Sequence, residues 1–380
     1  MITGQRRTSS GGCGHRVRGQ SLDRMTVAHI NRIATAVPPV DVHGAFVGIG
    51  RRFLSGDRRL ALFERMSARC QIEHRWSFID PVVGASGGAL DRDGFYTLGA
   101  FPGTARRMQR FEATAPDLAV RAVEALDLGI RARDITHVVV TSCTGLAAPG
   151  IDLLLVQRLG LNPSVERTVV GFMGCYAALN ALKVARHVVR SEPAAVVLVV
   201  SVELCTLHLQ ESVDLEQLLS FLVFGDGCAA AIVSAEPQGL ALDSFKALLA
   251  PQHADQITWH IRDQGFDMVL AGGVPASLGT VLRDGRDVML GGMPPGDVDL
   301  WAVHPGGRSV LDAVETALAL DNAALATSRG VLRENGNMSS ATILFVLRDL
   351  MMRAEPGMRG CGMAFGPGLT AETFLFSAAA

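Results

Sequence analysis

One cysteine, Cys175, has a local setting that favours a reactive thiol. It follows a β-branched run at 165–170 and the stretch Gly-Phe-Met-Gly, and a helix-like segment at 176–190 follows it. This spacing places Cys175 at a helix N-terminus, where free backbone amides and the helix dipole lower the pKa of a thiol. A small buried cysteine in a strand-to-helix turn explains the stretch equally well, so the local pattern leaves both interpretations open.

Two further polar residues stand where an α/β protein places its chemistry. His304 ends the apolar run 299–303 and begins His-Pro-Gly-Gly, and ligands bind at such carboxyl ends of parallel strands. Asn337 lies in a polar turn before a predicted helix at 341–352, and a side-chain amide beside a histidine can stabilise an oxyanion. Taken alone, His304 could be a hydrogen-bonded strand end and Asn337 part of a capped helix start.

Two glycine-containing stretches accompany them. Phe224 begins Phe-Gly-Asp-Gly, a tight turn before a strand, and its ring could belong to the core or line a cavity. Near the end of the chain, Gly366, Pro367 and Gly368 form a rigid loop whose backbone can approach a ligand. An ordinary surface turn has the same composition as this loop.

Alternating strands and helices must position these residues. The runs 136–141 and 194–200 read as buried strands, and 150–159 and 177–190 have helical spacing. Such alternation predicts βαβ units and largely parallel sheets, and the continuous apolar strands predict that both sheet faces are covered. The fold class is therefore α/β.

A weak internal repeat suggests duplication. The segment 134–142 resembles 297–305, since each is an Asp-led entry to a strand that ends in a polar residue near glycine. Two copies of one α/β unit would account for the length of the chain. A turn at 234–239 then divides it into halves at 25–235 and 236–380.

Composition excludes several classes of protein. Of 380 residues, 48% are hydrophobic and 19% charged, and the net charge is −2, so we expect a large core and neither nucleic acid nor a membrane surface as partner. No apolar run reaches the ~18 residues of a spanning helix. Seven scattered cysteines without a C-x-x-C pair predict a reducing, cytoplasmic setting and no metal site. The Arg-, Gly- and Ser-rich segment 1–24 lacks the apolar core of a secretory signal and is expected to be a disordered tail.

Taken together and in this order, the motifs resemble those of type III polyketide synthases, the chalcone-synthase-like family, and its bacterial members in particular. The resemblance covers residues 25–380. The matching pieces are Gly-Phe-Met-Gly-Cys175, Phe224-Gly-Asp-Gly, His304-Pro-Gly-Gly, Gly-Asn337-Met-Ser-Ser and Phe-Gly366-Pro367-Gly368. It implies a thiolase-like fold with duplicated βαβ-rich halves in a five-layer αβαβα architecture. It also implies a homodimer, acyl-CoA and malonyl-CoA as substrates, and no metal or bound cofactor.

The resemblance also implies residue roles. Cys175 would be the nucleophile that holds the starter and the growing polyketide as a thioester. His304 would pair with Cys175 to keep it as thiolate, and His304 and Asn337 would donate hydrogen bonds to the malonyl thioester as its enolate forms. Phe224 would be a gatekeeping aromatic that promotes decarboxylation, and Phe266 stands where the family has a second one.

Several cavity positions depart from the plant enzymes. Cys143, followed by Thr144, and His208 match positions that carry hydroxyl groups there, and Ala148 matches a methionine that lines the partner's cavity. Bacterial members with such changes commonly use fatty acyl starters, so the expected product is an alkylpyrone or alkylresorcinol. The alternatives are a malonyl-only synthase of the phloroglucinol or tetrahydroxynaphthalene type, and a single-condensation enzyme like β-ketoacyl-ACP synthase III. Phe224 and the Phe-Gly-Pro-Gly loop favour the polyketide synthase over the last.

The entrance for coenzyme A is only weakly marked. Arg69, His74 and Arg75 fall where family members place basic residues for the CoA phosphates, and Arg308 closely follows the His-Pro-Gly-Gly motif. Each of these side chains reads equally well as a solvated surface charge. A papain-like protease shares the order Cys, His, Asn, but its local pattern Cys-Gly-Ser-Cys-Trp is missing from the sequence.

Overall fold

The computed structural model describes residues 26–54, 56–82, 88–127 and 132–380, together with residue 1. All but the first residue of the predicted tail at 1–24 lies outside the described residues. The strands are β1 (His29–Ala36), β2 (Val40–Asp41), β3 (Trp76–Ser77), β4 (His137–Ser142), β5 (Glu166–Gly171), β6 (Val197–Leu204), β7 (Asp226–Ser234), β8 (Leu240–Leu248), β9 (Ile257–Arg262), β10 (Gly265–Leu270), β11 (Leu300–Val303), β12 (Arg359–Gly366) and β13 (Thr370–Ala378). The helices are α1 (His43–Phe53), α2 (Asp57–Arg69), α3 (Thr104–Glu124), α4 (Ile151–Arg158), α5 (Ala177–Ser191), α6 (Leu215–Phe221), α7 (Val274–Met289), α8 (Arg308–Leu318), α9 (Ala326–Asn335) and α10 (Thr342–Met351). No helix in these ranges is long and apolar enough to cross a bilayer.

Nine of the described strands form one sheet, in the order β11-β12-β13-β8-β1-β7-β6-β4-β5. Three of its eight neighbouring pairs are parallel, namely β4 with β5, β4 with β6, and β11 with β12. The expectation of largely parallel sheets is therefore wrong. Short connections such as the turn between β12 and β13 return the chain antiparallel, because they are too short for a crossover helix.

The two faces of the strands belong to different cores. In β6, Val197 and Val199 pack into a central cluster that includes α5 and α10, whereas Leu198 and Val200 pack outward against α3. The same alternation follows from the two-residue period of a strand. Burial on both faces explains why the strands read as continuous apolar runs.

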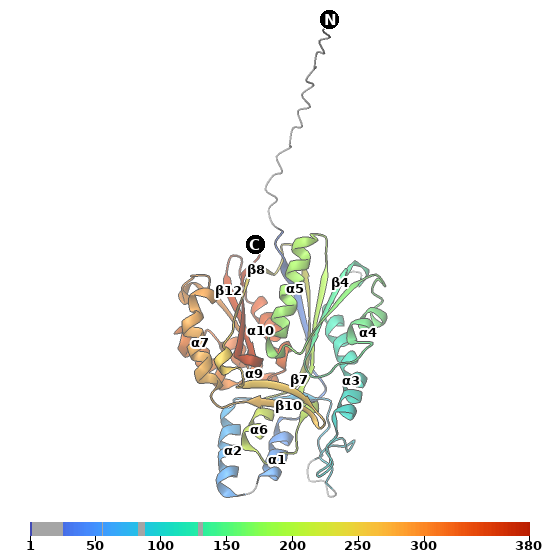
Figure 1. The fold of residues 1–380 in the computed structure, drawn as a ribbon, viewed down its shortest axis with the longest axis vertical. Coiled ribbons are helices and arrows are strands. Elements are labelled where there is room, and N and C mark those ends of the chain that lie inside the picture. Colours follow the sequence, from blue (N-terminus) through green and yellow to red (C-terminus); the bar gives the residue numbers. More distant parts are fainter. Residues whose placement is uncertain (2–25, 55, 83–87, 128–131) are drawn as a thin grey trace.

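Five layers result, as Figure 1 shows from α3 through the central helices α5 and α10 to α7. A third cluster packs α7 and α8 against the outer face of β11 and β12, through Leu282, Leu311 and Trp301 among others. The predicted thiolase-like αβαβα architecture is confirmed. The pairing of β1 with β8 spans only two residues, and it joins the strands of both halves into one sheet.

The internal repeat has a structural counterpart. Asp134 and Asp297 each end a short 3-10 turn, and the strands β4 and β11 follow these turns. The central helices also begin alike, because the 3-10 turns Gly174–Tyr176 and Ser339–Ala341 lead directly into α5 and α10. The two helix starts contact each other, and this contact builds the site.

Candidate active site

Cys175 lies in the 3-10 turn that opens α5, after β5, as the sequence predicts. Gly174 has a φ of 70°, and a Cβ on it would lie 2.2 Å from Cδ of Pro367. Only glycine therefore fits between the cysteine and the Gly366–Gly368 loop. A Cβ on Gly366 would lie 3.3 Å from the backbone nitrogen of Cys175, so the predicted loop packs directly against the nucleophile's segment.

Asn337 is fixed from several sides beside this cysteine. Its backbone N–H donates to the carbonyl of Val223 at 2.7 Å. Its side-chain oxygen accepts the N–H of Ser339 at 2.9 Å, and its amide nitrogen donates to the carbonyl of Gly306 at 3.2 Å. Hydrogen bonding from the side chains of Ser339 and Asn337 lowers the pKa of the Cys175 thiol. The structure thus brings the predicted cysteine and asparagine together.

His304 ends β11, and its backbone N–H donates to the carbonyl of Met363 at 2.8 Å. The ring is 1% exposed, and neither of its nitrogens has a hydrogen-bond partner among the described residues. Nε2 lies 3.8 Å from where a Cβ on Gly306 would stand, next to the carbonyl that Asn337 binds. Buried polar groups without partners are uncommon, so this ring is available to a bound molecule.

Burial controls the ionisation of the site. It raises the pKa of Cys175 to about 12, although hydrogen bonds from Ser339 and Asn337 lower it and the charge of Glu203 raises it. It also lowers the pKa of His304 to about 3. Desolvation therefore opposes the expected thiolate more strongly than the helix start favours it, although Cys175 itself is only partly buried. The pairing of His304 with Cys175 stays a prediction.

A small apolar cavity of about 30 Å³ opens onto Cys175. Predicted residues that line it are Cys143, Thr144, Phe224 and Pro367. Gly174 and Ser339 of the matching motifs also line it, together with residues that no sequence signal indicated, namely Cys205, Ser220, Phe221, Ile257, Trp259 and Met268. The volume is about one water molecule's share of liquid, so an acyl chain requires the aromatic and methionine side chains of the wall to move.

Phe266 and His208 lie behind the cavity wall. Their rings stack with centroids 4.2 Å apart, and neither residue lines the cavity. Two residues further along β10, Met268 occupies the lining position. Side chains two apart on a strand share a face, so Phe266 and Met268 lie on the same face of β10, and of the two only Met268 lines this cavity. The gatekeeping role of Phe266 stays a prediction.

Ala148 and Arg308 lie away from the sulfur. Ala148 is exposed, in the 146–149 loop beside a second cavity of about 210 Å³. Arg308 begins α8, is half-exposed, and donates a hydrogen bond to the carbonyl of Arg69 at 3.3 Å. The structure does not bring these two residues to Cys175.

Arg75 is a structural residue, and both interpretations offered for it from sequence are wrong. The side chain is fully buried, and it donates hydrogen bonds to the carbonyls of Phe221 and Phe224 and to His43. These hydrogen bonds hold the backbone of the Phe224 turn in place. Its neighbour His74 is exposed and pairs with Asp41 at 2.7 Å.

Sequence reasoning assigned no role to Glu203, a buried carboxyl group near the cysteine. Glu203 accepts hydrogen bonds from the N–H of Cys143, from the hydroxyl of Thr144 and from the hydroxyl of Ser340. Burial raises its pKa to about 7, although these hydrogen bonds lower it. A charged residue inside the apolar run of β6 was the sequence signal that could have identified it.

Comparisons with known proteins agree with this geometry. Models of the N-terminal and C-terminal domains of chalcone and stilbene synthases match residues 63–237 and 242–380. The alpha-pyrone synthesis polyketide synthase-like Pks18 of Mycobacterium tuberculosis is 34% identical over 368 residues, which cover 92% of this chain and 91% of that protein. A 1,3,6,8-tetrahydroxynaphthalene synthase of Streptomyces peucetius subsp. caesius is 36% identical over 262 residues, or 66% of this chain and 70% of that one.

A solved structure extends the likeness to the fold. The structure of PKS-I from the brown alga Ectocarpus siliculosus has a TM-score of 0.84 and 28% identity, and the match covers 94% of this chain and 100% of that chain. The predicted resemblance is confirmed. The chain belongs to the chalcone and stilbene synthase family of type III polyketide synthases, which are acyltransferases that catalyse decarboxylative condensation.

Proposed function

We propose that Cys175 accepts an acyl group from an acyl-CoA and holds it as a thioester through successive condensations with malonyl-CoA. The observation that carries this proposal is the position of Cys175 in the wall of an apolar cavity, where hydrogen bonding from Ser339 and Asn337 lowers the pKa of its thiol. The resting thiol is protonated, so we propose that its proton passes to the unbonded ring of His304 as the sulfur attacks. The thioester bond to coenzyme A then breaks, and His304 returns the proton to the departing coenzyme A sulfur.

After loading, the free donors act on the second substrate. The amide of Asn337 uses one N–H on Gly306, which leaves the other N–H for an incoming carbonyl oxygen. In the proposed step this N–H and the ring N–H of neutral His304 stabilise the enolate that forms as malonyl thioester loses carbon dioxide. Phe224 lines the cavity, and its apolar ring disfavours the malonyl carboxylate there. No metal or bound cofactor has a part in this scheme.

The starter is proposed to be a fatty acyl group and the product an alkylpyrone or alkylresorcinol. The lining is mostly apolar, with Phe221, Trp259 and Met268 able to contact an alkyl chain. The relative named for alpha-pyrone synthesis matches over nearly the whole chain, whereas the tetrahydroxynaphthalene synthase matches over two thirds of it. A malonyl-only reaction is therefore the second candidate.

The active form is proposed to be a homodimer formed across the edge strand β5. This edge carries exposed apolar side chains, Val169 and Met173, and Leu146 from the 146–149 loop is 45% exposed beside it. An exposed strand edge with apolar neighbours is a surface that soluble proteins usually cover. Sedimentation of the purified chain as a monomer would contradict this part of the proposal.

The experiment that tests the function is a product analysis by mass spectrometry with malonyl-CoA and acyl-CoA starters of graded length. We expect pyrones or resorcinols that carry the starter's alkyl chain, and no product from Cys175→Ala. Products without a starter chain would favour the malonyl-only reaction. A single β-ketoacyl product that requires a carrier protein would overturn the assignment of iterative extension.

A matched pair of variants tests the cavity wall. Met268→Phe narrows the space above Cys175 and is expected to shift products toward shorter starters. Met66→Phe places the same change on an exposed residue of α2 and should leave the product distribution unchanged. Identical product distributions for both variants would show that Met268 does not limit the starter.

A further inference from the structure

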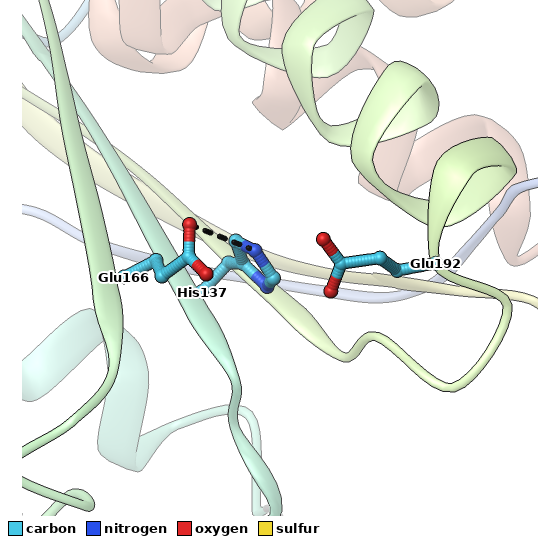
Figure 2. A group of neighbouring side chains, drawn as sticks. All are labelled: His137, Glu166 and Glu192. Atoms are coloured by element: carbon cyan, nitrogen blue, oxygen red, sulfur yellow. Dashed lines mark ion pairs between the residues drawn. The ribbon is translucent and has the colours of Figure 1, made fainter.

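Three side chains able to bind a metal ion meet at the amino end of β4, at the far end of that strand from Cys143. His137 begins β4, Glu166 begins β5, and Glu192 is the residue that ends α5. One ligand atom from each side chain lies within 4.8 Å of the other two. Figure 2 shows the imidazole ring between the two carboxylates. The proposed condensation reaction uses none of the three.

The hydrogen bonds around His137 fit a ring whose proton is on Nδ1. Nδ1 lies 2.8 Å from the hydroxyl oxygen of Thr136. That hydroxyl donates its single hydrogen to the carbonyl of Val196 and accepts the N–H of the same residue. With that hydrogen used on Val196, Nδ1 is the donor toward Thr136 in the tautomer that leaves Nε2 unprotonated, and such an outer partner is what orients a metal-binding histidine. In the neutral ring, the lone pair of Nε2 then faces the carboxylates.

This arrangement places a lone pair against negative charge at a buried side chain. The His137 side chain is 9% exposed, and the nearest carboxylate oxygen, of Glu166, lies 3.6 Å from Nε2. That distance exceeds the roughly 2.7–3.2 Å of a hydrogen bond. Two ligands of one tetrahedral zinc ion, each about 2.0–2.1 Å from the metal, stand about 3.4 Å apart. The separation therefore fits two ligands that share a cation.

We propose that His137, Glu166 and Glu192 bind a divalent transition-metal ion such as zinc, with water completing its coordination. An imidazole nitrogen with two carboxylates is a donor set that zinc accepts. The C-terminal end of α5 adds partial negative charge beside Glu192. The ion fastens the end of α5 to β4 and β5, and α5 is the helix whose opposite end follows Cys175. Its role is to stabilise the fold, remote from the reacting atoms.

The test titrates the full chain, first stripped of metal with EDTA and desalted, with cobalt(II) as a spectroscopic substitute for zinc. We expect one equivalent per chain, with the visible absorption of a tetrahedral ion and without thiolate charge-transfer absorption. His137→Gln and Glu192→Gln should each weaken binding at least about tenfold. Zinc at a hundredfold excess over its Kd should raise the Tm of the unsubstituted chain by about 3 °C and leave that of Glu192→Gln unchanged.

A matched control uses the other close histidine–carboxylate pair. His74 and Asp41 lie 2.7 Å apart at the surface and belong to no three-ligand group in the described ranges, so His74→Ala should bind cobalt as the unsubstituted chain does. Glu166 and Glu192 are exposed, so their glutamine variants remain informative if His137→Gln does not fold. Absence of binding, binding unchanged in both glutamate variants, or thiolate absorption would each overturn the proposal.

Discussion

His208 and His304 are both buried, and desolvation lowers the pKa of each to about 3, yet their hydrogen bonding is opposite. The Nε2–H of His208 donates to the carbonyl of Thr144 at 2.7 Å, and its Nδ1 accepts the N–H of Phe266 at 3.1 Å. Neither nitrogen of His304 is bonded to another described residue. One neutral imidazole therefore holds segments of the chain together, whereas the other has its full bonding capacity unused.

This difference in hydrogen bonding distinguishes a structural histidine, His208, from a histidine that is free to act on a substrate, His304. Burying a polar group without a partner costs free energy, and functional sites are where such a cost is commonly found. His208 connects the Thr144 loop to β10 behind the cavity wall, where Trp259 completes the packing of its ring. His304 lies beside Gly306, whose carbonyl accepts a hydrogen bond from Asn337. Replacing each histidine in turn should therefore give opposite results for stability and rate.

The largest effect is expected from His304→Gln. Polyketide formation should fall by about 10²–10³-fold or more, because the proton acceptor and enolate donor is lost. The free energy of unfolding should change by less than about 1 kcal/mol, because no hydrogen bond of His304 is removed. Steady-state rates and urea unfolding measure the two quantities. A variant that is destabilised but still active would reverse the comparison.

His208→Leu should instead lower the free energy of unfolding by about 2–4 kcal/mol. The substitution leaves the carbonyl of Thr144 and the N–H of Phe266 unpaired in a buried place. His260→Leu, at an exposed position of β9, is the matched control and should stay within about 0.5 kcal/mol. Urea unfolding checks both variants. Equal stability of the two would show that the hydrogen bonds of His208 contribute little.

Acid should destabilise the protein through both histidines. Each has an unfolded pKa of 6.5 and a folded pKa of about 3, so below pH 6.5 the unfolded chain binds protons that the folded chain does not. The free energy of unfolding contributed by each is complete above pH 6.5, and about 1.4 kcal/mol of it is lost by pH 5.5. Glu203 and Asp226 act in the opposite sense, because burial raises their pKa to about 7 and their contribution is lost as the pH rises toward 7.

Comparing a variant with the unsubstituted chain isolates the contribution of one residue to the pH dependence of the free energy of unfolding. Urea unfolding from pH 7 to pH 5 should show a shallower acid loss in His304→Gln than in the unsubstituted chain. An unchanged slope would mean that the folded state protonates His304 as readily as the unfolded state does.

The smallest effect is expected on the resting thiol. His304→Gln should change the rate of Cys175 alkylation by iodoacetamide at neutral pH by less than about twofold, because the ring has no hydrogen bond to the sulfur in the described structure. Ser339→Ala should slow alkylation, because it removes a hydrogen bond that lowers the pKa of Cys175. Mass spectrometry of the alkylated peptide measures both. A tenfold lower alkylation rate in His304→Gln would instead support the ion pair between Cys175 and His304 that the sequence suggested.

Local sequence patterns predicted the elements well. The helix after Cys175, the strand before His304 and the turn at Phe224 all lie where β-branched runs and glycines indicated them. Nearest-neighbour sterics and the periods of helix and strand act over a few residues, so one sequence carries this information. The parallel character of the sheet was overestimated, because strand direction depends on which distant strand each one meets.

The members of the site stay a prediction, and the sequence indicated their surroundings only in part. The order Cys175, His304, Asn337 was read from motif resemblance, and the structure places Asn337 beside the sulfur. Met268, rather than Phe266, faces the cavity, and Arg75 is buried beneath the Phe224 turn. Register on a two-residue period and burial of a long basic side chain are set by contacts with segments far away in sequence, which spacing cannot supply.

The sequence by itself determined which residues are chemically capable, because side-chain type and local spacing belong to the chain. Only the tertiary structure decided the pKa and the hydrogen-bond partners of these side chains. Burial raises the pKa of Cys175 and lowers that of His304. Packing gives His208 two hydrogen-bond partners, leaves His304 with none among the described residues, and brings His137, Glu166 and Glu192 together from three separate elements. Ionisation and hydrogen bonding depend on the whole shell of neighbours around an atom, and folding assembles that shell from residues that the sequence keeps far apart.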